Sequence, residues 1–396
     1  MKKIIALLTA AAIFYDIFTP LRLVFDGGRA LMLLIPTAFI IVFDHLFTRK
    51  SFLPVIAYVG VASLMRVMGS EYFSIPGLLG VLFAYSCFEH YCVTRDDNYA
   101  KIVLMALYGS LMLMVFASLP QFIVMPKLSR IMMDAEENGI VDPILFWTIS
   151  YPAIHSLPIY SIPLFFIAKN KRIIRWLRLF AVVSVVAIFV LLIYADSTTA
   201  LLLNVGIFLV MLFYNPDIKL SRNVIRLIGA GVLALFILNK TILIGLLLLV
   251  QPVFSGSSTY MKIDEMIMSI SGQGSTGDLE AREELLKRSI NSFLSNPLLP
   301  EMDVSKIGCH NVLIDHIVAM GLLPGLTFIW FLIDRIKRPL RYLNSQNKVY
   351  YYLAVLAFLL MGLTKNFMLL LPTFAIVPMM LIYCDSKTFR DNYLKK

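Results

Sequence analysis

Apolar runs of about 20 residues alternate with short polar junctions along the whole chain. A helix needs about 20 mostly apolar residues to cross the hydrocarbon core of a bilayer. The pattern therefore predicts an all-α polytopic membrane protein with a single integral membrane domain over residues 1–396. About twelve segments meet this criterion. They lie near residues 4–25, 30–47, 52–68, 76–93, 102–120, 144–168, 179–196, 199–214, 227–250, 311–333, 349–371 and 372–384.

Hydrophobic residues make up 59% of the chain and charged residues 15%, a composition unlike that of a soluble domain. The net charge of +10 is compatible with nucleic-acid binding. However, the Lys and Arg residues form short clusters between the apolar segments, and no basic stripe follows a helix face. We therefore exclude nucleic acid as a partner and expect membrane lipid instead. The first apolar segment lacks a small-residue cleavage site, which predicts a retained signal-anchor.

The basic clusters also predict the orientation of the chain. If residues 1–3 lie inside and the segments alternate, most Lys and Arg residues fall in the inside junctions and in the C-terminal tail. This is the positive-inside pattern of membrane proteins. Both termini are then cytoplasmic.

In this orientation, two longer connections lie on the extracytoplasmic side of the membrane. The larger covers residues 251–310, and the smaller covers residues 121–143. In a compact protein, a connection of more than about 15 residues is usually functional or disordered. The larger loop contains the sequence DLEAREELLKRSINSFLSNP, in which Asp278 can cap a helix and Pro297 can stop it. We therefore predict a large extracytoplasmic loop that contains helices.

The four cysteines are Cys87, Cys92, Cys309 and Cys384, and their spacing fits neither a CxxC motif nor a zinc site. We expect no structural disulfide framework, no bound metal and no cofactor.

The loop helix carries one arginine on its apolar side. At about 100° per residue, an apolar stripe includes Arg282, whereas Lys287 and Arg288 point away. The stripe consists of Leu279, Leu286, Ile290 and Phe293. An arginine in such a stripe extends to water, pairs with a nearby glutamate, or binds an anion with its planar guanidinium. The last possibility makes Arg282 a candidate for binding a phosphate or a carboxylate.

His310, Asn311 and Asp315 stand at the beginning of the tenth apolar segment. The N–H groups and the dipole of a helix N-terminus favour an anion there, and a neutral imidazole is a suitable general base. Asp315 lies deeper than His310, and an acid inside a span is functional or paired by default. The alternative is structural: His310 and Asn311 satisfy the helix end, and Asp315 pairs with a neighbour.

Two further candidates for substrate binding lie elsewhere in the apolar segments. His155 belongs to a segment broken by three prolines, an arrangement that is tolerated where a span lines a cavity, and Lys365 lies in the eleventh segment. Most such residues form structural pairs. Gly321 and Gly325, with Pro324 between them, indicate close helix packing and a kink.

Two stretches, AREELLKRSINSFLSNPLLP and GCHNVLIDHIVAMGLLPG, together resemble the O-antigen polymerase and O-antigen ligase superfamily. The family pattern is an arginine at the start of a loop helix, an Asn-Pro break, a His-Asn or His-Ser pair that enters a span, and a Gly-Leu-Leu-x-Gly end. In this chain the pattern consists of Arg282, Asn296, Pro297, His310, Asn311, Gly321 and Gly325. The match covers about 50 residues directly, and the layout with one dominant external loop agrees over most of the chain.

The resemblance implies a metal-independent glycosyltransferase of the bacterial cytoplasmic (inner) membrane. Its donor is a glycan linked to undecaprenyl diphosphate, and its partners include other polysaccharide-assembly proteins such as a chain-length regulator. The family's loop arginine and histidine carry over to Arg282 and His310 as catalytic residues, with Asn311 and Asp315 as substrate-binding residues.

One position departs from the family pattern. Members often carry a Ser-Arg pair after the seventh span, whereas this chain has Ser197, which matches, followed by Thr198. Either the positive charge is not needed, or another basic residue supplies it. The candidates for that residue are Arg130, Lys262, Arg288 and Lys365.

The resemblance leaves three functions open. Asp315 after the apolar pair is more similar to polymerases, which join lipid-linked repeat units. The single dominant external loop is more similar to ligases, which transfer the glycan to the lipid A core. A flippase for lipid-linked oligosaccharides would share the many spans, but it does not need an ordered external loop of about 60 residues. We expect a polymerase.

Overall fold

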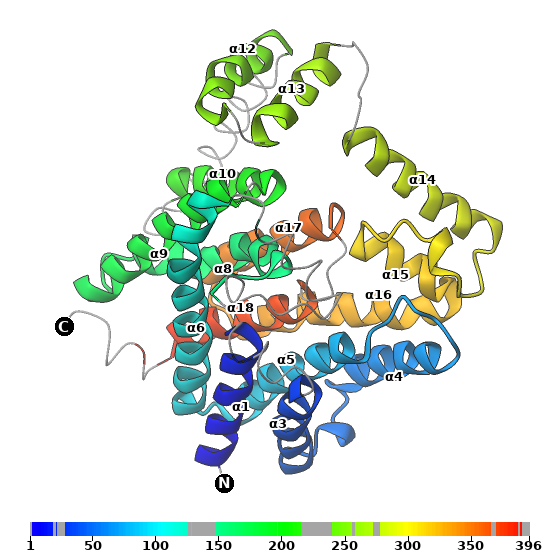
Figure 1. The fold of residues 1–396 in the computed structure, drawn as a ribbon. Coiled ribbons are helices and arrows are strands. Elements are labelled where there is room, and N and C mark those ends of the chain that lie inside the picture. The colour runs from blue at the N-terminus through cyan, green and yellow to red at the C-terminus, as the bar shows by residue number, and fades with distance from the viewer. Residues whose placement is uncertain are drawn as a thin grey trace.

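The computed structural model describes residues 2–18, 21, 28–125, 128, 147–195, 197–214, 240–255, 258–271, 278–365, 370–386 and 389. Over these residues the chain is helical and contains no strand, which confirms the all-α prediction (Figure 1). The α-helices are α1 (Lys2–Ile17), α3 (Arg29–Phe43), α4 (Leu53–Val67), α5 (Ile75–Thr94), α6 (Asp97–Val124), α8 (Tyr151–Lys169), α9 (Arg175–Tyr194), α10 (Thr198–Phe213), α12 (Lys240–Val250), α13 (Ser258–Ser271), α14 (Asp278–Ser295), α15 (Val312–Met320), α16 (Leu322–Lys337), α17 (Ser345–Gly362) and α18 (Leu370–Cys384).

Three of the described helices, α6, α8 and α9, are long and apolar enough to cross a membrane. Several others, including α3, α4 and α10, are apolar but shorter. The outer face of α9 exposes large apolar side chains, among them Leu179 (62% exposed) and Val186 (54% exposed). Exposed apolar faces of this kind suit a lipid environment. The number of twelve spans and the large external loop stay predictions, and most of the expected loop over residues 121–143 lies outside the described residues.

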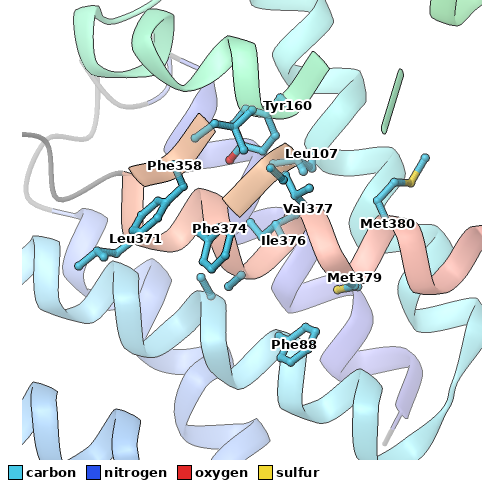
Figure 2. Packing of buried hydrophobic residues seen from close by; sticks show 14 of the residues in the cluster. Phe88, Leu107, Tyr160, Phe358, Leu371, Phe374, Ile376, Val377, Met379 and Met380 are labelled. Carbon is cyan, nitrogen blue, oxygen red and sulfur yellow. The ribbon is translucent and has the colours of Figure 1, made fainter. Parts of the chain in front are cut away.

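The core forms where α8 and α18 meet the surrounding helices. α8 packs against α9, α10, α17 and α18, and most of its side chains are buried. Figure 2 shows the apolar side chains of α18 beside Tyr160 of α8, Leu107 of α6 and Phe88 of α5. Phe374 of α18 stacks on Phe358 of α17, with 4.6 Å between the ring centroids. The sequence predicted a segment broken by three prolines, but α8 runs continuously through Pro158 and Pro163, and Pro152 lies in its first turn. It is a central element of the bundle.

A buried ion cluster joins α5 to α16. The Oε1 atom of Glu89, which is fully buried, accepts a hydrogen bond from Nη1 of Arg335 at 2.9 Å. Arg338 forms a second ion pair with Glu89, and Asp334 pairs with Arg335. Two acids thus balance two arginines, which offsets the high cost of removing these charges from water.

Polar contacts connect each end of α3 to a neighbouring helix. The Nδ1 atom of His90, near the end of α5, lies 2.6 Å from Oδ2 of Asp44, the residue after the end of α3. At the other end of α3, Arg29 binds Asp16 of α1 at 2.7 Å. One end of α3 is thus held to α5, which also carries Glu89 of the ion cluster, and the other end is held to α1.

The tenth predicted segment is not one continuous helix. It breaks at Gly321, which has a φ of +66°, and the Leu322 N–H donates to the Pro297 carbonyl at 2.8 Å. His316 of α15 stacks on Phe328 of α16 with 4.7 Å between the ring centroids, so the two helices pack on one another. The kink expected at the glycines is thus a complete break. The nine-residue α15 spans only about 14 Å, too short to cross a bilayer alone.

We expect Gly321→Ala to destabilise the protein by about 2–4 kcal/mol. A Cβ atom at this position would lie 2.4 Å from the backbone oxygen of Leu299, and the left-handed φ disfavours any side chain. The matched control is Gly325→Ala, whose Cβ would meet the Cβ of Met320 at an ordinary 3.8 Å. Thermal unfolding of both purified variants in detergent checks the prediction. Equal midpoints for the two variants would contradict it.

Candidate functional site

The loop helix α14 turns a different face to the bundle than its apolar stripe predicts. It begins at Asp278 as predicted and ends at Ser295, two residues before Pro297. Ser289 is fully buried, whereas Ile290 from the predicted stripe is 43% exposed. The buried face is therefore rotated toward Ser289. Arg282, which lies seven residues before Ser289 and so two turns away on the same side, is close to the centre of this face.

Gly308 brings the segment before α15 into direct contact with α14. Its N–H donates to Oγ of Ser289 at 2.8 Å, and a Cβ on Gly308 would lie 2.2 Å from the backbone oxygen of Leu285. Only a glycine fits this approach. Because Arg282 precedes Leu285 by one helical turn and His310 comes two residues after Gly308, the contact places both candidates at the same junction. The Nε atom of Arg282 and the Nε2 atom of His310 are both shielded from solvent.

Asp315 ties α14 to the beginning of α15. Its Oδ1 atom accepts the Ser289 hydroxyl at 2.6 Å, and its Oδ2 atom accepts the Asn311 N–H at 2.6 Å. The carboxylate is fully buried. Since both of its oxygens are used within the protein, Asp315 acts as a positioning residue for the site, the paired role that the sequence left open. Its contact with substrate stays a prediction.

The N-terminus of α15 keeps part of its hydrogen-bonding capacity. The Val312 N–H donates to the Lys365 carbonyl at 2.9 Å. The side chain of the N-cap residue Asn311 makes no hydrogen bond to the first turn. The next two N–H groups, of Leu313 and Ile314, lie in the first turn of α15 and have no partner within the helix. These groups are available to an anion.

Three other candidates come together beside this helix. Ser197 Oγ lies 3.3 Å from Nδ1 of His155, and both residues are buried. The ring of His155 lies at right angles to that of Tyr151, with 4.6 Å between the centroids. The Tyr151 hydroxyl is 3.5 Å from Nζ of Lys365. Because the Lys365 carbonyl also binds α15, this row of side chains reaches the start of that helix.

Of the remaining candidates, Arg288 is described and does not join this arrangement. Arg288 is exposed on α14 and donates from Nη1 to the Ser305 carbonyl at 3.4 Å, away from Arg282. Lys262 belongs to α13, but its side chain lies outside the described residues, as does Arg130. Of the two described basic candidates, Lys365 is linked to Ser197 through Tyr151 and His155, and Arg288 is not.

Cys309, which precedes His310, adopts a left-handed backbone with a φ of +52°. Partial removal of its sulfur from water raises the pKa of the Cys309 thiol to about 11, and the nearby charge of Asp315 contributes in the same direction. The thiol therefore stays protonated near neutral pH, which argues against Cys309 as a nucleophile.

Sequence reasoning gave His316 no role, and the structure assigns it one. Its Nδ1 atom lies 2.9 Å from the Tyr72 hydroxyl, and its Nε2 atom lies 2.9 Å from the Tyr58 hydroxyl. The ring is fully buried. His316 thus connects α15 to Tyr58 of α4 and to Tyr72, which lies between α4 and α5. Tyr58 and Tyr72 are more than 240 residues away in sequence, so no local pattern indicated this contact.

A cavity of about 300 Å³ lies among α1, α3, α5, α8 and α18. Its lining includes the Asp16–Arg29 pair and, from α8, Pro152 and Ala153. None of the candidate residues that the structure describes lines it. On α8, Tyr151 and His155 occupy a different face from Pro152 and Ala153.

The fold and the site together define an all-helical protein with helices long and apolar enough to span a membrane and a buried polar site at the start of α15. The sequence matches no known protein-family model, and the comparison with curated proteins finds no match. In the described part of the chain, no three His, Cys, Asp or Glu side chains group so as to hold a metal ion.

We expect Asp315→Ala to lower the free energy of unfolding by about 1–3 kcal/mol, because the Ser289 hydroxyl and the Asn311 N–H lose their buried acceptor. Asp303→Ala is the control: this exposed acid lies between α14 and α15 and caps a short turn at Ser305. A double-mutant cycle with Ser289→Ala measures the coupling between α14 and α15. Additive effects of the two substitutions would show that the tie is not formed.

Proposed function

We propose that this protein is a polysaccharide polymerase of O-antigen or capsule type in the bacterial cytoplasmic membrane. It transfers a glycan from undecaprenyl diphosphate to a sugar hydroxyl of a second lipid-linked repeat unit. The observation that carries the proposal is the close approach of Gly308 to α14, which joins the segment before His310 to the helix that carries Arg282. The resemblance of this same stretch to the O-antigen polymerase and ligase superfamily supports it.

The two residues have complementary tasks in this reaction. The acceptor oxygen forms a bond to the anomeric carbon while the bond from that carbon to the diphosphate oxygen breaks. The imidazole of His310 takes the proton of the acceptor hydroxyl. The guanidinium of Arg282 stabilises the charge that develops on the leaving diphosphate. A single direct displacement inverts the anomeric centre.

The orientation is inferred from the two ends of the bundle. Arg335 of the ion cluster binds the carbonyl of Ser51, which follows the basic sequence TRK, and the positive-inside rule assigns this junction to the cytoplasm. The start of α15 contacts the segment after α17, away from the basic sequence before Ser345, and we assign it to the extracytoplasmic side. A donor with a membrane-embedded polyprenyl tail presents its diphosphate at this depth, which explains why the site lies where a loop meets the bundle.

The test is polymer formation in cells whose surface polysaccharide depends on this protein. We expect His310→Ala and Arg282→Ala each to lower the polymerisation rate by about 100-fold, and so to remove the long bands of a gel ladder. Arg288→Ala is the matched control, because this arginine lies on the same helix and faces away. An unchanged ladder for both site variants at normal protein levels would overturn the assignment.

A further inference from the structure

One exposed stripe of α14 changes from charged to apolar along the helix. Glu283 and Lys287 form an exposed ion pair at 2.7 Å. Ile290 and Leu294 continue the same stripe, because residues three and four apart are neighbours on a helix surface. Both are exposed, Leu294 to 68%. The side of α14 that carries Ser289 is held to α15, so this stripe forms a second, outward face of the helix.

The apolar part of the stripe continues into the loop after α14. Leu298 and Leu299 are about half exposed. The Leu298 carbonyl accepts the Leu323 N–H at 3.4 Å, and the Leu299 oxygen lies 2.4 Å from where a Cβ on Gly321 would stand. The loop therefore rests on the first turn of α16. We call Leu294, Leu298 and Leu299 the leucine patch.

The two sides of α16 differ sharply in burial. Phe328 and Phe331 are fully buried and stack beside Tyr58 of α4. The other side exposes an apolar stripe at helical spacing, which consists of Leu323, Leu326, Trp330 and Ile333. A stripe of this length suits the acyl chains of a bilayer. The leucine patch lies at the Leu323 end of this stripe and extends it onto the loop helix.

The backbone of the loop also suits a lipid boundary. A peptide group without a hydrogen-bond partner is costly where lipid replaces water. Pro297 and Pro300 have no N–H group that would need a partner. The Pro297 carbonyl accepts the Leu322 N–H at 2.8 Å, and the Leu298 carbonyl is bonded to α16 as well. The loop therefore brings few backbone polar groups to the lipid along with its leucines.

We propose that the leucine patch inserts into the bilayer and holds the C-terminal half of α14 at the membrane surface. The partner is lipid, because the patch continues the exposed apolar stripe of α16. The half of α14 with Glu283 and Lys287 stands in water, and the boundary falls between Lys287 and Ile290. The loop helix is thus attached on one side to α15 and on another to the bilayer. This attachment goes beyond the proposed reaction and does not depend on it.

The experiment measures the surroundings of nitroxide spin labels on the full chain in phospholipid nanodiscs. The variants are made in a Cys309→Ser chain, because Cys309 is the exposed one of the four cysteines. Leu294→Cys tests the patch, Lys287→Cys is the aqueous control on the same stripe, and Leu326→Cys is the reference on α16. We expect the Leu294→Cys label to collide more with oxygen, which concentrates in lipid, than with a water-soluble nickel complex. The Leu326→Cys label behaves in the same way, and the Lys287→Cys label shows the reverse.

Two results would overturn the inference. A Leu294→Cys label that collides more with nickel than with oxygen lies in water. A label shielded from both reagents, while Leu326→Cys meets oxygen, is covered by protein. If Leu294→Cys fails to fold, Leu298→Cys decides by the same comparison. Since no readout uses polymer formation, the membrane contact stands if the labels meet oxygen but the wild type makes no polymer, and only the proposed function then fails.

Discussion

The carboxylate of Asp315 holds the loop helix α14 to the bundle, and the arrangement of the site depends on this contact. In the described structure, α14 packs mainly against α15 and the short turn at Val304–Lys306. Ser289 and Asn311 both donate to Asp315 in a buried setting, where a charged acceptor makes strong hydrogen bonds. Without this tie, no other described hydrogen bond between side chains would hold α14 to α15.

The scaffold around this tie is fixed at several points. α16 begins at the Gly321 break, where Leu322 binds the Pro297 carbonyl, and its other end enters the ion cluster through Arg335. His316 fixes α15 from the opposite side through two tyrosine hydroxyls. The short helix α15 is thus held by α14, by the end of α17 and by the α4 region. Such rigid support is what a site needs if it is to hold charged groups in a productive geometry.

The sequence predicted the helical class and the bounds of α14 well, because apolar periodicity, capping residues and Pro297 are local signals. It also identified Gly321, although the backbone contact with Leu299 that makes a side chain impossible there involves a distant segment. The partners of Asp315 and His316 were not predictable. Ser289 lies 26 residues from Asp315, and Tyr58 lies 258 residues from His316, so these pairings exist only in the folded chain. The same holds for Tyr151, which joins His155 to Lys365 and had no distinguishing feature in the sequence.

The central claim is that the junction of α14 and α15 catalyses glycan transfer from a lipid diphosphate. Its most direct test is an assay with the purified protein in liposomes that contain fluorescent lipid-linked repeat units. The account predicts polymer of increasing length and the release of undecaprenyl diphosphate in proportion to the bonds formed, without any nucleotide sugar. Movement of the lipid-linked units between leaflets, with neither polymer nor free undecaprenyl diphosphate, would contradict it and would identify a flippase instead.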